Sequence, residues 1–312
     1  MLELSPSHWL AAFALGLGLE ALLGEPRRWH ALVGFGRLAQ RVEAGLNRGR
    51  ARIARGLLAW CGLVLGGVAL FIALRSLLPD ALQWLADGLA LWFALGARSL
   101  FEHIAAIATP LAAGDLATAR AAVARIVSRD CSTLEADGIA AAGLESALEN
   151  GADAIFASLC WFALLGGPGV LLHRLANTLD AMWGYRSVRF LQFGRVAARA
   201  DDVLCWLPAR LTALSYALLG HRRSALHSWR RQAPLWDSPN AGPVMAAGAG
   251  ALGVQLGGPA CYHGQWETRP LLGQGHKATA ADLMRGVQLL RRTLLLWLLV
   301  LGLLGGLRLC WS

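Results

Sequence analysis

The amino-acid sequence predicts a mostly α-helical protein that passes several times through a lipid bilayer. Apolar residues make up 56% of its 312 residues and charged residues only 16%, whereas about a quarter of an ordinary soluble domain is charged. Long runs of the chain carry almost no charge, and arginines gather directly beside some of them. This pattern is typical of a polytopic integral membrane protein whose cytoplasmic helix ends carry positive charge.

Six apolar segments are the candidates for membrane helices: residues 9–23, 56–74, 81–97, 154–172, 203–219 and 293–307. A helix of about 20 apolar residues spans the hydrocarbon core of a bilayer. The second segment is uncharged, whereas the third contains Asp87 and the first contains Glu20. We expect three or four of the six segments to be spanning helices.

Two of these segments are better interpreted as re-entrant or interfacial. Residues 154–172 contain a Gly-Gly-Pro-Gly sequence that should break a helix, and residues 203–219 carry Arg210 in their middle. A complete crossing by the first would place the arginine-rich residues 174–199 outside, which the positive-inside rule disfavours. Irregular backbone at membrane depth is tolerated where it lines a cavity.

The charged stretches 98–153, 173–202 and 221–292 are then expected to form cytoplasmic helical loops of a single membrane-embedded domain, residues 1–312. The net charge of +9 is attributed to membrane topology first and to anion binding second. We find no zinc-finger spacing and no nucleic-acid-binding module, so nucleic acid is excluded as a partner. The six cysteines form no CxxC pair and are expected to be small buried residues in a reducing compartment.

Carboxylates recur at helical spacing just before the fourth apolar segment. Ser132 followed by Glu135 is typical of a capping box, so a helix is expected to begin there. Glu145, Glu149 and Asp153 would then share one face, where like charges repel by roughly 0.2–0.5 kcal/mol per pair. Mg²⁺ would relieve that repulsion because it prefers oxygen ligands. The alternative is an acidic face in contact with solvent.

A second acidic cluster stands at the edge of the fifth apolar segment. Asp201 and Asp202 precede it directly, where acidic pairs are costly unless they meet a cation. The simpler account is a local ion pair between Arg199 and Asp202. Arg210 is interpreted either as a functional intramembrane residue or as an arginine that reaches the interface. We expect Asp201 and Asp202 to lie close to the Glu145 face and to share a metal–phosphate site with it.

Two glycine-rich stretches follow. Residues 240–264 are uncharged but contain too much glycine and proline for a good helix. They are interpreted as a mobile loop or as a surface where backbone approaches a large flat ligand. Further on, Thr279 and Asp282 indicate a helix N-terminus, and Lys277 beside it could hold a phosphate. The glycines there lack the spacing of a P-loop.

Five longer strings are colinear with the motifs of one known family. They are GEPRRWHALVGFGRLAQRVE, RDCSTLEADGIAAAGLESALENGAD, NTLDAMWGY, ARADDVLCWLPARLTA and NAGPVMAAGAGALGVQLGG. The second resembles the family pattern RD-T … ES-x-x-EN-x-x-D, and the fourth resembles AR-x-DD-x-x-N-x-x-PARL. The family is that of the adenosylcobinamide-phosphate synthases, the CobD/CbiB family of cobalamin biosynthesis.

The resemblance implies an amide ligase. It would join the amine of aminopropanol, or of its O-phosphate, to the propionate carboxylate of adenosylcobyric acid, giving adenosylcobinamide or its phosphate. ATP and Mg²⁺ are implied because a carboxylate must be activated before an amine attacks it, and cobalt enters only as part of the substrate. The implied location is the inner (cytoplasmic) membrane, with the active site on the cytoplasmic side. An oligomer and contacts with other membrane-associated enzymes of the nucleotide-loop pathway stay open.

The motif positions define the predicted site. The predicted catalytic residues are Glu145, Glu149, Asp201 and Asp202. The predicted substrate- and phosphate-binding residues are Arg129, Asp130, Asn150, Asn177, Asp180, Tyr185, Arg199, Arg210, Asn240 and Lys277. The predicted Mg²⁺ ligands are Glu145, Glu149, Asp153 and Asp202.

The sequence departs from the family pattern at a few positions. Ala31 replaces the proline that usually follows the histidine at 30, Cys131 replaces the threonine after RD, and Cys205 replaces the asparagine of DD-x-x-N. The alternative functions are a corrinoid-related membrane transporter, which would suit broken intramembrane segments, and a membrane sensor or regulator. The sequence shows no inverted repeat, and a regulator would not need the full set of acidic, asparagine and arginine motifs.

Overall fold

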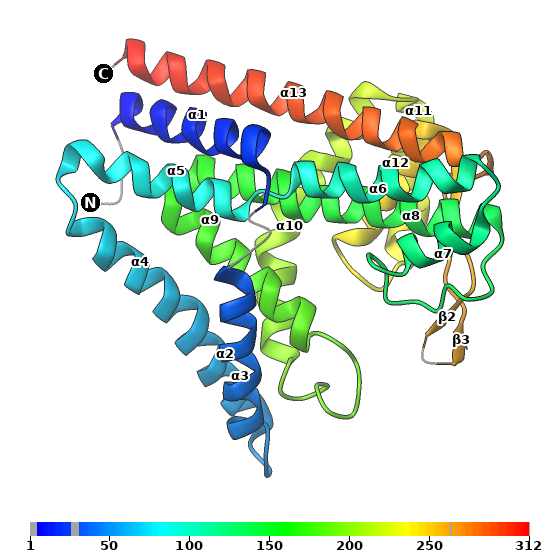
Figure 1. The fold of residues 1–312 in the computed structure, drawn as a ribbon, viewed down its shortest axis with the longest axis horizontal. Helices are drawn as coiled ribbons and strands as arrows, with labels where there is room; N and C mark the ends of the chain where they lie inside the picture. The colour runs from blue at the N-terminus through cyan, green and yellow to red at the C-terminus, as the bar shows by residue number, and fades with distance from the viewer. Residues whose placement is uncertain (1–4, 26–30, 263, 312) are drawn as a thin grey trace. The chain divides into compact units, whose positions relative to one another are not determined.

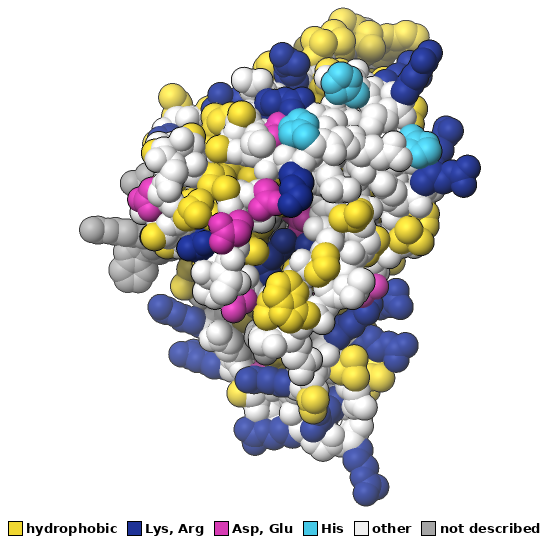
Figure 2. Space-filling model, turned by 90° about the vertical axis from the view of Figure 1, so that its right-hand side faces the viewer, with side chains coloured by type: hydrophobic (Ala, Val, Ile, Leu, Met, Phe, Trp, Pro, Cys, Tyr) yellow, Lys and Arg dark blue, Asp and Glu magenta, His cyan; other side chains and the backbone are white. Residues whose placement is uncertain are grey.

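The computed structural model describes residues 5–25, 31–262 and 264–311, and it is mostly helical. The chain forms two compact units, the first made of Met1–Gly96, Ala157–Cys205 and Leu301–Ser312, and the second of Ala97–Phe156 and Trp206–Val300. The expectation of one synthase domain over residues 1–312 stays a prediction. Figure 2 shows basic side chains over much of one face, with a few acidic side chains between them.

The first unit is built from helices alone in the part of the chain that the structure describes. Its elements are α1 (Pro6–Leu23), α2 (Ala31–Leu46), α3 (Arg52–Trp60), the π-helix η1 (Cys61–Leu65), α4 (Gly66–Ser76), the 3-10 helix η2 (Asp80–Leu82), α5 (Gln83–Ala94), α9 (Ser158–Trp183) and the first part of α10 (Arg195–Leu219). Figure 1 shows α1 beside α5. The two helices approach closely where Gly16 meets Gly88, since a Cβ at either position would collide with the other helix.

A buried ion pair holds the middle of this unit. Arg75 at the end of α4 donates from Nε to the carboxylate of Asp87 on α5 at 2.7 Å, and both side chains are buried. The other Asp87 oxygen accepts the backbone N–H of Gly167 at 2.9 Å. Asp87 therefore has partners for its charge inside an apolar segment, where an unpaired carboxylate would cost several kcal/mol.

The predicted break at residues 166–169 is confirmed as a kink inside α9. Gly166 adopts φ 62° and ψ −147°, which L-residues with a side chain rarely adopt. Pro168 follows and has no N–H to donate. The chain nevertheless resumes as helix, and the Asp87 carboxylate binds the Gly167 N–H at the kink.

The second unit combines helices with short strands. Its elements are α6 (Ala97–Ala112), α7 (Leu116–Val123), α8 (Ala136–Gly151), the π-helix η3 (Ala152–Ala157), the rest of α10, α11 (Arg222–Gln232), the 3-10 helix η4 (Ala233–Leu235), α12 (Ala241–Leu252), β1 (Val254–Gly257), β2 (Ala260–Tyr262), β3 (Gln265–Glu267), β4 (Leu271–Leu272), β5 (His276–Lys277) and α13 (Ala280–Cys310) as far as Val300. The end of α13, from Leu301 on, belongs to the first unit. Strand β1 lies between β4, which is antiparallel to it, and β5, which is parallel; β2 and β3 form a hairpin.

The expectation that residues 240–264 are not helical is wrong for their first half. Helix α12 covers Ala241–Leu252, and every residue in it is buried. Its glycines permit close packing: a Cβ on Gly248 would collide with Leu148 of α8, and one on Gly250 with the backbone of α11. Burial between neighbouring helices offsets the low helix propensity of glycine, which costs about 1 kcal/mol per residue.

Two expected helix starts have different outcomes. The capping box at Ser132 is wrong, because α8 begins at Ala136 and the Ser132 N–H is bound by the Asp130 carboxylate at 2.9 Å. The start at Thr279 is confirmed, since α13 begins at the next residue and Asp282 accepts from both the N–H and the hydroxyl of Thr279 at 2.9 and 2.7 Å.

More helices are suited to a membrane than the three or four expected spans. Among the residues that the structure describes, six helical stretches are long and apolar enough to cross, namely Pro6–Leu23, Arg52–Ser76, Asp80–Ala112, Ala136–Trp183, Arg195–Leu219 and Ala280–Cys310. Six single crossings would place the loops on either side of Arg195–Leu219 on opposite faces of the membrane. The re-entrant interpretation instead keeps these two loops on the same side.

Cysteine labelling distinguishes the two topologies. We expect single cysteines at Arg186 and Arg222 to be blocked together by a membrane-impermeant maleimide only when the cytoplasmic face is exposed. The background would carry serine at Cys61, Cys261 and Cys310, the cysteines that are not buried. Labelling of the two positions from opposite faces would contradict the re-entrant interpretation and support a complete crossing.

Candidate functional site

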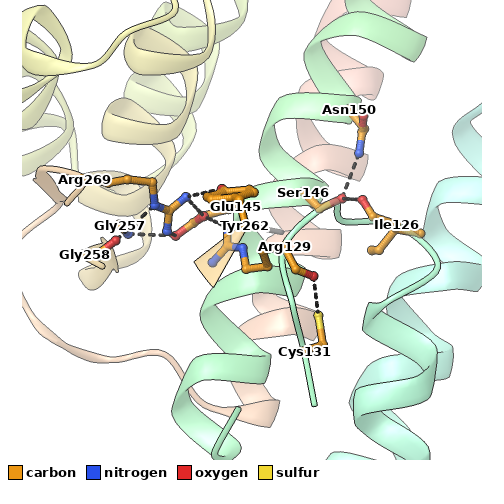
Figure 3. Close-up of polar contacts among 10 residues, drawn as sticks. All are labelled: Ile126, Arg129, Cys131, Glu145, Ser146, Asn150, Gly257, Gly258, Tyr262 and Arg269. Atoms are coloured by element: carbon orange, nitrogen blue, oxygen red, sulfur yellow. Dashed lines mark hydrogen bonds and ion pairs between the residues drawn. The ribbon is translucent and has the colours of Figure 1, made fainter. Parts of the chain in front are cut away.

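A buried carboxylate held by two arginines is the centre of the second unit (Figure 3). Glu145 projects from α8, Arg129 comes from the loop before that helix, and Arg269 comes from the segment between β3 and β4. The exposed fractions of these three side chains are 3%, 10% and 12%. Three segments that are distant in sequence are thus joined at one point.

Both oxygens of the Glu145 carboxylate are engaged. Oε2 accepts from Arg129 and from Nη1 of Arg269, the latter at 3.1 Å. Oε1 accepts the Gly257 N–H at 2.8 Å and lies 3.5 Å from Nη2 of Arg269. A buried carboxylate with this many charged and backbone donors stays ionised and oriented.

Arg269 is a residue that the sequence analysis missed. Its Nε donates to the Gly258 carbonyl at 3.0 Å, its Nη1 lies 3.4 Å from the Tyr262 hydroxyl, and its guanidinium lies over the Trp236 ring at 5.2 Å. The available signal was an isolated arginine beside the glycine-rich block, in a stretch that carries none of the recognised motifs.

The charge balance of this network is positive. Burial lowers the pKa of Arg129, but the charge of Glu145 and the hydrogen bond to it outweigh burial and raise that pKa overall. Arg129, Arg269 and Glu145 therefore carry one excess positive charge as a group. An anion nearby would be favoured by that excess.

The network also orders the segment around the RD motif. The Asp130 N–H donates to the Cys261 carbonyl of β2 at 2.8 Å, and the exposed Asp130 side chain accepts the Ser132 N–H, which lowers the pKa of that carboxyl. One helical turn beyond Glu145, Asn150 donates to the Ser146 hydroxyl at 2.8 Å, and Ser146 donates to the Ile126 carbonyl at 3.1 Å. Asp130, Ser132 and Asn150 are the exposed members of this group.

Two other predicted residues of the second unit meet each other. Arg210 donates from Nη1 to the Asn240 side chain at 2.7 Å and from Nη2 to the Pro239 carbonyl at 2.9 Å. Its guanidinium lies 4.6 Å from the Trp206 ring. Arg210 thus connects α10 to the start of α12, and its role in binding substrate stays a prediction.

Five predicted residues gather in the first unit, where α9 faces α10. Asn177 donates to Asp201 at 3.3 Å, and the charges of Asp180 and Asp202 act on Asp201. Arg199 is the local partner of Asp202 at 3.7 Å, but the Arg199 side chain is 74% exposed. The expected Arg199–Asp202 ion pair is therefore present and solvent-screened.

The remaining predicted residues are more dispersed. Glu149 and Asp153 are partly exposed on α8 and η3, and Tyr185 is exposed. Lys277, the one lysine of the sequence, pairs with Asp137 at 2.7 Å. The expected proximity of Asp202 to Glu149 stays a prediction, because the two residues belong to different units. Residues 26–30 of the N-terminal motif lie outside the described residues.

Comparison with known proteins identifies close relatives. The model of the CobD/CbiB protein family matches residues 13–290. A cobalamin biosynthesis protein CobD of Stutzerimonas stutzeri is 56% identical over 290 residues, covering 92% of this chain and 95% of the relative. The proteins of the same name from Chromobacterium violaceum and Mycobacterium tuberculosis are 52% and 41% identical, covering 91% and 89% of this chain and 92% and 90% of the relatives. No solved structure matches the chain.

Replacing the Glu145 carboxylate tests how much it contributes to the stability of the fold. We expect Glu145→Gln to lower the free energy of unfolding by about 3–5 kcal/mol, because removing one partner leaves buried arginine charge without compensation. Glu135→Gln is the matched control, since Glu135 is 76% exposed and its pair with Arg120 at 3.6 Å should contribute at most about 1 kcal/mol. Denaturant unfolding in detergent measures both. Equal stabilities of the two variants would show that the network does not hold the unit together.

Proposed function

Because the chain belongs to the CobD/CbiB family, we propose that it is a cobalamin biosynthesis enzyme that forms the amide bond between adenosylcobyric acid and aminopropanol or aminopropanol phosphate. Its relatives are named for cobalamin biosynthesis and cover nearly its whole length. Several apolar helices are compatible with a membrane protein. We place the enzyme in the inner membrane, with the reaction on the cytoplasmic side.

The observation that carries the proposal is the convergence of motif residues on Glu145. The RD motif contributes Arg129, the ES motif contributes Glu145, and the glycine-rich motif contributes the Gly257 N–H. The glycine-rich motif is far from the other two in the sequence, since Gly257 and Glu145 are 112 residues apart, and it has no reason to meet them in a simple bundle of apolar helices. Their meeting supports a site that the family resemblance concerns, next to exposed polar groups of Asp130 and Asn150.

The proposed reaction has two steps. A propionate oxygen of the corrinoid attacks the γ-phosphorus of ATP, which forms an acyl phosphate and releases ADP. The amine nitrogen, once its ammonium proton has gone to a base, attacks the acyl carbon; the C–N bond forms and phosphate leaves. Cationic groups lower the barrier by offsetting the charge on the transferred phosphoryl group, and a carboxylate can accept the ammonium proton.

The contacts suggest which residues position the site and which contact substrate. Arg129 and Arg269 direct their donors to Glu145, so we assign these three as positioning residues that hold the RD loop and the end of β1. Residues with solvent exposure, such as Asp130, Asn150 and Lys277, are better placed to contact substrate. Of the predicted catalytic acids, Glu145 is less favourable as the base that accepts the ammonium proton, because proton transfer to it would break its ion pairs with Arg129 and Arg269.

The implied Mg²⁺ can be compared with its predicted ligands. Glu149, Asp153 and Asp202 are partly exposed carboxylates, and oxygen ligands with access to water suit Mg²⁺. Glu145 does not fit, because both of its oxygens already accept from arginine or backbone donors. When bound, Mg²⁺ would neutralise phosphate charge during transfer.

The proposal is tested with purified protein in detergent. We expect the amide product, detected by mass spectrometry, when adenosylcobyric acid, aminopropanol phosphate, ATP and Mg²⁺ are all present, and no product when ATP or Mg²⁺ is omitted. Replacing aminopropanol phosphate by aminopropanol then identifies the preferred amine. No product under any condition, together with ATP-independent corrinoid uptake into proteoliposomes, would favour the transporter alternative.

Substitution of the partly exposed acids tests the site assignment. We expect Glu149→Gln and Asp202→Asn to lower the amide-forming rate by about 100-fold or more, as losses of electrostatic stabilisation commonly do, while unfolding stays close to that of the unchanged protein. Glu135→Gln is again the control, with an unchanged rate. Full activity of both variants would show that these acids are not part of the site and only contact solvent.

A further inference from the structure

Three side chains of metal-binding type meet inside the first unit. His173 of α9 is fully buried, and Cys205 and Asp201 of α10 are exposed by only 2% and 9%. The Cys205 sulfur lies 3.5 Å from Nε2 of His173 and 3.7 Å from each carboxylate oxygen of Asp201. One nitrogen, one oxygen and one sulfur atom all lie within 4.8 Å of one another.

We propose that His173, Asp201 and Cys205 bind a zinc ion. Zinc accepts this mixed set of ligands, with bonds of about 2.3 Å to sulfur and about 2.0–2.2 Å to nitrogen and oxygen in tetrahedral geometry. Two ligands of those bond lengths at the tetrahedral angle are about 3.5 Å apart. The sulfur–nitrogen and sulfur–oxygen distances already have nearly this value, so little rearrangement is required.

The charges that act directly on Asp201 favour a cation. Asp180 and Asp202 act electrostatically on it, whereas the nearby arginine charges act on His173 and on Asp202. Zinc would bind Cys205 as the thiolate and release the thiol proton to solvent. The ion, the thiolate and the Asp201 carboxylate then sum to zero charge, which costs less to bury than an isolated carboxylate.

The surroundings complete the argument. Asn177 donates to Oδ1 of Asp201 at 3.3 Å, the kind of contact that orients a metal-binding carboxylate. Nδ1 of His173 is buried with no hydrogen-bond partner in the described part of the chain. Nε2 is the ring nitrogen that faces the Cys205 sulfur, at 3.5 Å. It is therefore the nitrogen placed to bind the ion, whereas Nδ1 would keep its proton.

Zinc binding and amide formation are measured separately, although Asp201 is both a zinc ligand and a predicted catalytic residue. The zinc site contains Cys205, which stands where the family pattern has asparagine, and it omits Glu145, Glu149 and Asp153. Soft sulfur and imidazole ligands distinguish it from an oxygen-rich Mg²⁺ site. Failure of amide formation would therefore leave the zinc proposal intact, and loss of zinc would leave the amide proposal intact.

Metal analysis of the full chain tests the proposal. Protein purified in detergent without chelators is expected to hold about one zinc per chain, measured by inductively coupled plasma mass spectrometry. Cys205→Ser and His173→Gln should lose most of this zinc. Cys160→Ser is the matched control, because Cys160 is also a buried cysteine of α9 but lies outside the group of three, so its zinc content should not change.

Cobalt substitution gives a readout that does not depend on how well a variant folds. Co²⁺ added to metal-depleted, otherwise unchanged protein should produce the sulfur-to-cobalt charge-transfer absorption and the intense visible bands of a tetrahedral thiolate site. The same spectrum is expected for Cys160→Ser and not for Cys205→Ser. Protein that binds neither ion beyond the level of Cys205→Ser, or zinc retained in both ligand variants, overturns the proposal.

Discussion

The second unit depends on the burial of one carboxylate. Glu145 is placed on α8 among apolar neighbours, where an unpaired negative charge would cost several kcal/mol. Its charge is offset by hydrogen bonds from Arg129, Arg269 and the Gly257 N–H. The loop before α8, the end of β1 and the segment before β4 must therefore meet, although Glu145 and Arg269 are 124 residues apart.

That meeting requires backbone to come very close to backbone. Gly257, at φ 77°, lies where a Cβ would collide with the carbonyl of Pro270, directly after Arg269. Without a side chain there, β1 can pair with β4 and present its N–H to Glu145 at the same time. The small residues of α12 also permit a close approach, because they let that helix pack closely against α8 and α11. The glycine-rich motif thus serves packing and backbone donation together.

Features that depend on local sequence could be predicted. The long apolar helices follow from hydropathy, the kink follows from the conformational freedom of Gly166, and the start of α13 follows from Thr279 and Asp282. Features that depend on distant partners could not. Helix α12 is stabilised by packing against neighbouring helices, which its own composition does not reveal. The helix expected to begin at Ser132 does not begin there, because the Ser132 N–H is bound by the Asp130 carboxylate instead.

The candidate site divides in the same way. Motif resemblance indicated Arg129, Glu145, Arg210 and Asn240, and the structure joins them in pairs. The motif resemblance could not indicate that Arg269 completes the network around Glu145, because arginine beside glycine is common in loops. The pattern of three acids on one face also overlooked that the first acid is buried with arginines, whereas the other two are partly exposed.

The two buried acidic residues of the predicted site show why burial alone does not assign a role. Glu145 is neutralised by two arginines and a backbone N–H, so its charge serves to join segments. Asp201 is surrounded instead by an imidazole, a thiol, an amide and two further carboxylates. None of these carries a fixed positive charge, and an ion of opposite sign would complete the set. Both carboxylates are buried, but their opposite surroundings account for a structural ion pair in one unit and for the proposed metal site in the other.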